Sequence, residues 1–516
     1  MTMPPLLDLE LLVSPQAFLS LVLLPLFFLF LFTTVKRSFS SHKPKPPLLP
    51  SPPKLPFIGN LHQIGPLPHL SLHSLSSTYG PLMHLQLGQV PTLVVSSADM
   101  AAEVYKTHDA IFASRPKFKV AEILSYNFAA LVFTPYGKFW RRMRKICGQH
   151  ILNPKKEESY IPVKEEEVAV MAEKIRAASL QSSPVNLSDV LFGFANDVIC
   201  RIVSGKFFRK EGRNELFRML IDNNTALFSG FHAGNCFPKL GWLDGVIGVI
   251  RAAKKNINRW DDVLNKVIKE HREGSTEDGG AEDFTHVLLS LQGDPNLGLE
   301  LKDDHVKSLL VDMFAAGTDT SSITLEWTMS ELVRNSHVMK KLVDEVRGIA
   351  GENSKVRMED LNKMSYLKAV VKETLRLHPP IPLLLPKETT EDCHIRGYYI
   401  PKGTRVFVNA WSIGRDPKYW EAPNEFNPER FINNQVDYRG NHFQFIPFGA
   451  GRRICLGLQF AINAIELAVS NLVNQFDWEL PYGMTSEELD MEEAPGLTTH
   501  RKSRLKLIPK PRAFSK

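Results

Sequence analysis

Cysteine is scarce in this chain of 516 residues, which contains five of them. Their number is odd, their spacing is wide and none forms a C-x-x-C pair, which argues against a disulfide framework and against a cysteine-based zinc site. We therefore expect a reducing, cytosolic environment in which most of these thiols are ordinary core or surface groups. Only one has unusual neighbours; the five are Cys147, Cys200, Cys236, Cys393 and Cys455.

The signatures of several enzyme classes are also missing. The chain contains no P-loop, no H-E-x-x-H and no G-x-S-x-G, and its charge is nearly balanced at a formal +6. No dense basic cluster with interleaved aromatic residues occurs, so nucleic acid is not an expected partner. With 43% hydrophobic residues and no repeat or internal linker, the chain is predicted to build one large domain around a large core.

Long hydrophobic runs are absent except at the N-terminus. Residues 11–35 contain no charged side chain, and about 20 apolar residues suffice to span a bilayer. Asp8 and Glu10 precede the run and basic residues follow it, whereas a cleaved signal peptide has its basic residues first. This asymmetry predicts a retained anchor over residues 1–35, with the remainder of the chain on the cytosolic side.

Proline is concentrated directly after this run. Residues 36–56 are basic and proline-rich, which predicts a stiff, extended connector. Residues 57–516 combine short β-like runs with long helical patterns and are predicted to form a mainly α body with small β-sheets, an α+β fold. Within it, residues 81–95 predict a hairpin and residues 136–350 are largely helical.

Glycine and arginine surround Cys455. Residues 447–457 read Pro-Phe-Gly-Ala-Gly-Arg-Arg-Ile-Cys-Leu-Gly, and an apolar helical pattern follows from Leu458 to Leu472. The glycines allow the backbone to approach closely, and amide groups near a helix start, together with Arg452 and Arg453, would stabilise an anionic sulfur. A buried structural cysteine beside a turn is the alternative, but the neighbours favour a metal-binding thiolate.

This string resembles the haem-binding signature of the cytochromes P450, whose spacing is matched by Phe448, Gly451, Arg453, Cys455 and Gly457. The chain further resembles plant A-type members of the 71 clan from the proline-rich connector to its C-terminus. The resemblance implies the cytochrome P450 fold behind an N-terminal transmembrane helix, with residues 57–516 as the haem-thiolate catalytic domain. It also implies haem b as the cofactor and Cys455 as the axial ligand of the iron.

Leu456 departs from this pattern, because plant members usually carry proline directly after the cysteine. The position follows the iron ligand rather than providing it. We therefore expect altered packing of the loop and unchanged ligation.

A small polar notch is predicted in a long helical pattern from Asp303 to Arg334. Gly317 costs about 1 kcal/mol relative to alanine inside a helix, and the hydroxyl of Thr320 can bond the carbonyl of Ala316. A helix-packing contact at Gly317 is the alternative. The resemblance assigns Asp319 and Thr320 to proton delivery during oxygen activation and places Ala316 against the haem.

Other candidate residues follow from the resemblance. Glu373 and Arg376 share one face of a predicted helix over residues 366–377, and the family pattern implies a buried structural cluster that they form with Arg430. Haem contacts are implied for Trp140, Arg144, His378, Phe448, Gly449 and Arg453. Substrate contacts are implied for the 112–130 loop and for Ala315, Ala316, Ile381, Leu385 and Leu497, although plain core packing explains any one of these equally well.

Two surface regions are candidate docking sites. Arg141, Arg142 and Lys145 are expected to stay exposed and to face an acidic flavoprotein. Residues 237–243 are hydrophobic and are a candidate for contact with the membrane surface. The mostly apolar substrate segments indicate a small hydrophobic or aromatic substrate.

The predicted function is a haem-thiolate monooxygenase of the endoplasmic reticulum membrane. It would oxidise a plant specialised metabolite with O2 and with electrons passed from NADPH by NADPH–cytochrome P450 reductase. Hydroxylation, ring formation, desaturation and dehydration share these motifs. A reductase-independent isomerase or dehydratase on the same fold is one alternative, against which Thr320 counts, and a non-catalytic haem-binding or sensor protein is another.

Overall fold

The computed structural model describes residues 49–180, 183–205, 214–230, 232–273 and 283–514. Residues 49–395 and 400–514 belong to one body, and residues 396–399 group apart from it. The anchor predicted over residues 1–35, and the first part of the connector, lie outside the described residues. No helix in the part of the chain that the structure describes is long and apolar enough to cross a membrane.

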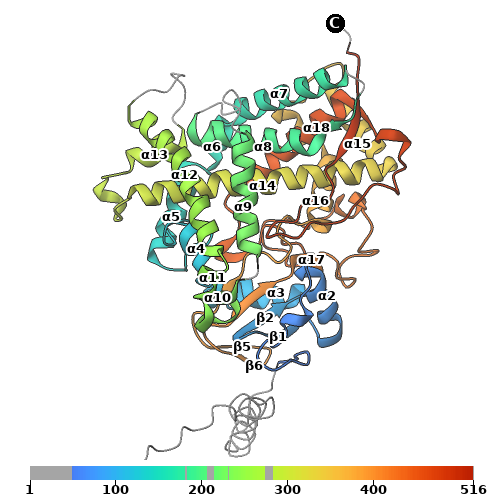
Figure 1. Cartoon of the computed structure of the whole chain (residues 1–516). Coiled ribbons are helices and arrows are strands. Elements are labelled where there is room, and N and C mark those ends of the chain that lie inside the picture. The colour runs from blue at the N-terminus through green and yellow to red at the C-terminus, as the bar shows by residue number, and fades with distance from the viewer. Residues whose placement is uncertain (1–48, 181–182, 206–213, 231, 274–282, 515–516) are drawn as a thin grey trace, which may run out of the picture. The chain divides into compact units, whose positions relative to one another are not determined.

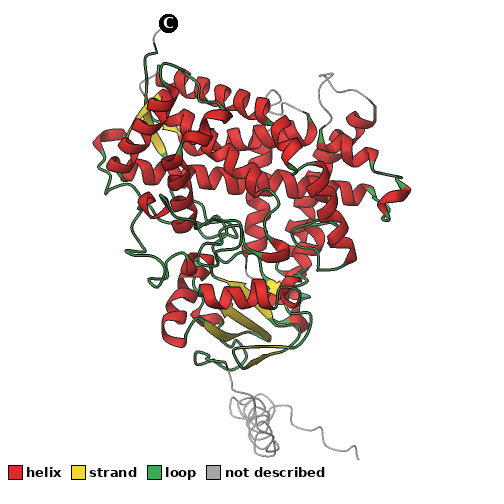
Figure 2. Cartoon of the chain, turned by 180° about the vertical axis from the view of Figure 1, so that it is seen from behind, coloured by secondary structure: helices red, strands yellow, loops and turns green. Residues whose placement is uncertain are grey.

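Helices dominate the body, as predicted, and the strands gather in small groups (Figure 2). The longer helices are α2 (Pro68–Tyr79), α5 (Lys138–His150), α7 (Ile161–Ser179), α8 (Leu187–Ser204), α9 (Asn214–Ser229), α12 (Val249–Arg272), α14 (Asp303–Arg334), α15 (Ser336–Ala350), α16 (Ser365–Leu377) and α18 (Leu458–Gln475). The shorter ones are α3 (Ala98–Ala102), α4 (Lys119–Leu124), α6 (Pro154–Ser159), α10 (Ala233–Cys236), α11 (Leu243–Val246), α13 (Phe284–Ser290) and α17 (Ala410–Ile413).

Short 3-10 and π-helical segments connect these elements. A π-helical turn, η3, covers Glu103–Thr107. The 3-10 turns are η2 (Leu61–Gln63), η4 (Ile111–Ala113), η6 (Pro238–Leu240), η7 (Pro295–Leu297), η8 (Met358–Lys363), η9 (Pro428–Phe431), η10 (Gly451–Arg453) and η11 (Pro481–Gly483).

The main sheet has four strands in the order β1 (Leu82–Leu87), β2 (Val90–Val95), β7 (Arg405–Val408) and β4 (Lys387–Glu388). β1 and β2 pair antiparallel, which confirms the predicted hairpin. β2 pairs parallel to β7, and β7 pairs antiparallel to β4. A second sheet has the order β3 (Val185–Asn186), β9 (Lys506–Pro511) and β8 (Phe476–Glu479), and two further short strands are β5 (Cys393–Ile395) and β6 (Tyr398–Ile400).

Helix α14 lies at the centre of the helical part (Figure 1) and has the predicted bounds. Asp303 and Asp304 in its first turn and Arg334 in its last complement the helix dipole. α8, α18 and α16 pack against it, and α7 packs on both α8 and α18. The sequence makes this helix polar at many positions, but most of these side chains are buried among neighbouring helices, so its surroundings hold α14 in a fixed place.

The last residues of the predicted connector rest on the body. The amide of His84, on β1, donates to the carbonyl of Pro50 at 2.8 Å. The side-chain amide of Asn60 donates to the carbonyls of Pro52 and Pro53. Because proline also fixes φ in this segment, these bonds hold residues 50–53 against β1 and Asn60.

Candidate functional site

The loop that carries Cys455 is shaped by the elements on either side of it. η10 ends at Arg453 and α18 begins at Leu458, and the amide of Cys455 donates to the carbonyl of Phe448 at 3.1 Å. Gly451 has a φ of 65°, and a Cβ there would lie 2.4 Å from Oδ1 of Asp109, so only glycine fits. The loop therefore presents Cys455 just ahead of the start of α18.

Cys455 is the one exposed cysteine; the other four are buried. The protein around the thiol nevertheless removes most bulk water, and this desolvation raises the pKa of Cys455. The amide of Gly457 and the guanidinium of Arg144 act in the opposite direction, because both stabilise the thiolate. An accessible sulfur held by an amide and a cation suits a thiolate that binds a metal.

Arg453 is held by backbone oxygens. It donates to the carbonyls of Ala113, Leu131 and Thr134 at 2.6, 3.2 and 2.5 Å. Its guanidinium carbon lies 4.3 Å from the ring centre of Trp140, whose indole N–H donates to the same Leu131 carbonyl. Burial, and repulsion from Arg115 and Arg144, lower the pKa of Arg453 to about 8, which shows how poorly the charge is compensated.

Three more cations lie near Arg453. Arg144 donates to the carbonyl of Ile454 at 2.8 Å and lies over Trp140. Arg115 is buried and donates to backbone carbonyls of residues 132, 385 and 386, and burial lowers its pKa to about 10. Buried Lys387 bonds the carbonyl of residue 112, and burial lowers its pKa well below the usual value. We call these four residues the cation cluster.

Within the described residues, no carboxylate forms an ion pair with any member of the cation cluster. Buried charges are normally paired, so the cluster fits a ligand that brings its own negative charges. The two propionates of a haem are such charges, and guanidinium groups bind carboxylates well. The cluster next to the accessible Cys455 thiol therefore suits a haem whose iron is bound by sulfur.

His378 was predicted beside these residues but is held by a different set of contacts. Its ring stacks on Trp327 at 4.1 Å, and its Nε2 lies 2.7 Å from Oε1 of Glu331. Its Nδ1 is buried and has no hydrogen-bond partner among the described residues. That atom can therefore still bond a ligand.

The predicted notch in α14 is present at Thr320, whose hydroxyl donates to the carbonyl of Ala316 at 2.7 Å. Ala316 is exposed although α14 is mostly buried. Gly317 has another role, because a Cβ there would lie 2.5 Å from Cδ1 of Ile199 on α8. At this glycine the packing alternative holds, and the notch comes from Ala316 and Thr320.

Asp319 has a partner that the sequence did not reveal. Nε2 of His500 lies 3.0 Å from Oδ1 of Asp319, whose side chain is 5% exposed, against 24% for the histidine. Burial lowers the pKa of His500, but the charges of Asp319, Glu326 and Asp222 outweigh this and leave it raised. His500 lies far beyond the end of α14 in the sequence and belongs to no motif, so no sequence signal pointed to it.

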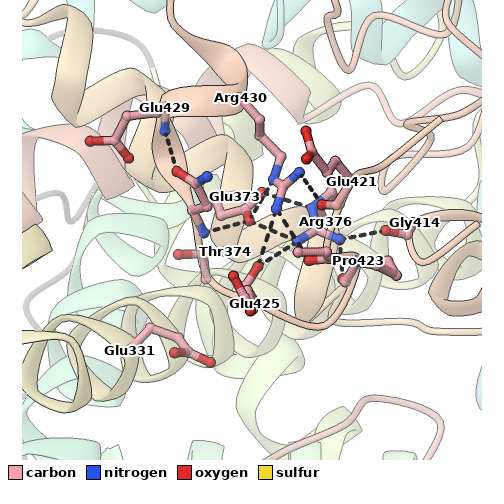
Figure 3. Close-up of polar contacts among 12 residues, drawn as sticks. Glu331, Glu373, Thr374, Arg376, Gly414, Glu421, Pro423, Glu425, Glu429 and Arg430 are labelled. Atoms are coloured by element: carbon pink, nitrogen blue, oxygen red, sulfur yellow. Dashed lines mark hydrogen bonds and ion pairs between the residues drawn. The ribbon is translucent and has the colours of Figure 1, made fainter. Parts of the chain in front are cut away.

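The predicted cluster around Glu373 is assembled and fully satisfied (Figure 3). Arg376 binds both carboxylate oxygens of Glu373 at 2.7 Å, and Nε of Arg430 donates to Oε1 at 3.0 Å. The remaining Arg376 N–H groups bond the carbonyls of Gly414, Pro423 and Glu425. Neither Glu373 nor Arg376 is exposed.

Three of the candidate substrate segments, the 112–130 loop, residues 380–385 and residues 497–499, are connected by hydrogen bonds. The amide of Thr499 donates to the carbonyl of Pro380 at 2.9 Å, and Trp327 on α14 donates to the carbonyl of Thr499. The carbonyl of Leu385 accepts from Arg115. The segment that carries Ile381 and Leu385 therefore joins the Leu497 region to the cation cluster. Ala315, Ile381, Leu385 and Leu497 are half-buried.

The neighbours of the cysteine also occupy defined places. Phe448 is half-buried and its ring meets that of Tyr438 edge-on at 5.7 Å. Gly449 adopts a φ of 70°, which glycine takes readily. Leu456 is half-buried and packs against the hydrophobic core, so the loop accepts leucine at this position.

Comparison with known proteins gives consistent matches. The profile of the family described as Cytochrome P450 matches residues 49–507. The chain is 49% identical to cytochrome P450 71A9 of Glycine max over 89% of this chain and 92% of that one. It is 46% identical to an indole-2-monooxygenase of Zea mays, over 95% and 94%. A zebra fish cytochrome P450 solved with abiraterone aligns with a TM-score of 0.73 and 28% identity, covering 87% of this chain and all of that one.

Proposed function

The chain belongs to the cytochrome P450 family of haem-thiolate monooxygenases, and we propose that it oxidises a small hydrophobic or aromatic plant metabolite. O2 and electrons from NADPH, delivered by a flavoprotein reductase, complete the reaction. The observation that carries this proposal is the accessible Cys455 beside the cation cluster. An anionic, metal-containing ligand satisfies both features.

Haem b is the cofactor of this family. In the proposed site the thiolate of Cys455 would bind the haem iron, and the haem would supply the chemistry that activates O2. Arg144 and Arg453 would hold the propionates, and Arg115 and Lys387 would add positive charge that the sequence alone had not indicated. Nδ1 of His378 offers a further bond. Trp140 positions the two arginines with its ring, since its N–H already bonds Leu131.

Protons reach the reacting centre through α14. The Thr320 hydroxyl donates to the Ala316 carbonyl, so its oxygen lone pairs remain available to hold a water or to accept a proton. Asp319 is buried, whereas His500 is partly exposed. We assign His500 the role of linking solvent to Asp319, which then supplies Thr320. A histidine suits this step because the unperturbed pKa of imidazole lies near neutrality; nearby carboxylates raise the pKa of His500.

The redox partner is proposed to bind the exposed face of α5. Arg141, Arg142 and Lys145 are all exposed on this helix, while Arg144 between them turns inward to the cation cluster. An acidic flavoprotein bound here would be separated from the cluster by one helix. Opposite charge on two such surfaces accelerates their encounter.

An endoplasmic reticulum location is proposed with residues 1–35 as a single anchor, 36–56 as the connector and the body on the cytosolic face. Large apolar side chains are exposed at Phe57, Leu240, Trp242, Val246 and Ile247. The segment around Phe57 and the segment that leads to Leu240 both contact the turn between β1 and β2. The amide of Gly88 donates to the carbonyl of residue 58, and the amide of Gln89 donates to the carbonyl of residue 236. This apolar region beside the connector supports contact with a lipid surface.

The substrate is proposed from the candidate substrate segments. Ala315, Ile381, Leu385 and Leu497 contribute apolar, half-buried side chains. An apolar site with few polar groups selects small hydrophobic or aromatic molecules.

Turnover of the purified full-length chain tests the proposal. With reductase and NADPH, a panel of small aromatic substrates should give NADPH consumption, O2 consumption and an oxygenated product together. Substrates for the panel are chosen by the spin-state change that they cause in the haem absorbance. Product formed from a peroxide without reductase would support the isomerase alternative, and haem binding without any NADPH consumption would support the sensor alternative.

A further inference from the structure

Two histidines and an aspartate meet where α12 ends and α13 begins, and α13 packs against both α8 and α12. His271 lies in the last turn of α12, Asp283 caps α13, and His286 lies in the first turn of α13. One nitrogen from each histidine and one oxygen of Asp283 all lie within 4.8 Å of one another. The side chains of His271 and Asp283 are 0% and 7% exposed, and that of His286 is 35% exposed.

The orientation of His271 is that of a metal ligand. Its Nδ1 lies 2.7 Å from the carbonyl of Val267, which can only accept, so Nδ1 carries the hydrogen. In the neutral ring Nε2 then has the lone pair, and this atom lies 2.9 Å from Oδ2 of Asp283. Metal-binding histidines typically donate their second N–H to a backbone carbonyl in this way. Two lone pairs facing each other require a cation, either a proton or a metal ion.

His286 distinguishes between these two cations. Its Nδ1 lies 3.1 Å from Oδ1 of Asp283, yet it is buried and makes no well-directed hydrogen bond with any described residue. Oδ1 of Asp283 already accepts the backbone amide of His286 at 2.9 Å. A proton shared by His271 and Asp283 leaves Nδ1 of His286 without a well-directed hydrogen bond to a described residue, whereas a metal ion would bind this nitrogen in the tautomer that carries its hydrogen on Nε2.

The surroundings favour positive charge. Gly205 ends α8 with a φ of 62°, and a Cβ there would lie 2.8 Å from Oδ2 of Asp283, so only glycine lets the end of α8 approach the carboxylate this closely. The C-terminal ends of α8 and α12 both lie at the cluster, and a helix C-terminus carries partial negative charge. The hydroxyl of Thr285 bonds the carbonyl of Val203 at 2.7 Å, which fixes α13 to α8.

We propose that His271, Asp283 and His286 form a binding site for a divalent transition metal ion, with zinc as the best match. Two imidazole nitrogens and one carboxylate oxygen are a common zinc ligand set, and water would complete a tetrahedron. Tetrahedral ligands at zinc distances lie about 3.3 Å apart. The two histidines contact different oxygens of Asp283, His271 at 2.9 Å from Oδ2 and His286 at 3.1 Å from Oδ1, so the side chains must turn to bring two nitrogens and one oxygen around a single ion. The ion would tie α12 to α13, both of which pack on α14.

Zinc binding to the full-length, haem-loaded protein tests this site. After treatment with a chelator and dialysis, zinc content is measured by equilibrium dialysis and elemental analysis, with iron as the internal count of protein. We expect one bound zinc per haem, a higher midpoint of thermal unfolding with zinc than with chelator, and a zinc-edge absorption spectrum with two imidazole ligands. The His286→Gln variant should bind zinc at least tenfold more weakly and lose the zinc-dependent rise in the midpoint.

The control is His337→Gln, which removes an exposed imidazole at the start of α15 and should leave both readouts unchanged. The thiolate absorbance of the haem shows that each variant is folded. Equal zinc binding by wild type and His286→Gln would overturn the proposal and assign the zinc to adventitious histidines. No stoichiometric zinc in the wild type would overturn it too, and would leave a proton between His271 and Asp283.

Discussion

Two regions of this protein bury charge in opposite ways. Around Glu373 every charge is compensated, since Arg376 and Arg430 surround one carboxylate and backbone carbonyls take the remaining N–H groups (Figure 3). The cation cluster buries several positive groups that bond only backbone carbonyls. The first region is compensated by groups of the chain itself, whereas among the described residues no carboxylate forms an ion pair with the second.

On the proposed function, this difference separates residues that stabilise the fold from residues that would hold the cofactor. Removing one partner of a compensated buried group leaves another charge buried without a partner. Removing one cation from an uncompensated cluster relieves repulsion in the free chain and instead lowers the affinity for the ligand. Substitutions in the two regions should therefore affect different measurements.

The largest effect is expected for Glu373→Ala. It leaves Arg376 and Arg430 facing each other without the carboxylate, which should lower the free energy of unfolding by about 3–5 kcal/mol. Chemical unfolding, or the yield of folded haem protein, measures this. The matched control is Glu429→Ala on the neighbouring turn, which removes an exposed pair with Lys341 and should cost less than about 1 kcal/mol. Similar losses for both variants would break the distinction.

Arg144→Met probes the other region. We expect haem affinity to fall about 10- to 100-fold, because one charge-assisted bond to a buried anion contributes about 1.5–3 kcal/mol. The unfolding of the haem-free chain should change by less than about 1 kcal/mol. Haem affinity is measured by the transfer of haem to apomyoglobin. The control is Arg142→Met, which removes an exposed cation on the same helix. Strong destabilisation of the haem-free chain by Arg144→Met would instead give Arg144 a role in folding, like the residues around Glu373.

The Asp319–His500 pair lies between these two cases, since its charge depends on pH. His500→Gln should reduce the fraction of NADPH electrons that reach product about tenfold, because proton delivery slows while electron supply continues. Nearby carboxylates raise the pKa of His500. The ion pair between protonated His500 and Asp319 is therefore present at low pH and is lost as the pH rises through this raised pKa. Wild-type coupling should therefore fall at alkaline pH, and the variant should show no such fall. Equal coupling and equal pH profiles would exclude a role for His500.

The smallest effect is expected on the exposed face of α5. Reversal of charge at Arg141, Arg142 and Lys145 should slow reductase-supported turnover several-fold at low salt, and the difference should shrink as salt screens it. Turnover at several ionic strengths measures this, with peroxide-supported turnover as the control that needs no reductase. An unchanged rate at every ionic strength would remove α5 from the docking surface.

The sequence predicted those features that depend on local spacing. The bounds of α14, the hairpin of β1 and β2, and the bond from Thr320 to the Ala316 carbonyl are set by residues close in the chain. The family signature around Cys455 is local as well. Such patterns are visible in the sequence itself, because helix and strand periodicity extends over only a few residues.

Long-range partners could not be predicted in the same way. His500 meets Asp319, and Arg115 and Lys387 join the cation cluster, only because the chain folds back over large sequence separations. Gly317 illustrates the same limit, since its contact with Ile199 depends on how α8 packs on α14. Residue type alone does not reveal which partner tertiary packing will bring.

The reduced, carbon-monoxide-bound absorption spectrum of Cys455→Ser tests the central claim most directly. If Cys455 is the iron ligand beside the cation cluster, the variant should retain a folded body yet lose the red-shifted Soret band that a thiolate ligand produces, while Cys393→Ser, which alters a buried thiol elsewhere, should keep it. A thiolate band that persists in Cys455→Ser would contradict the account.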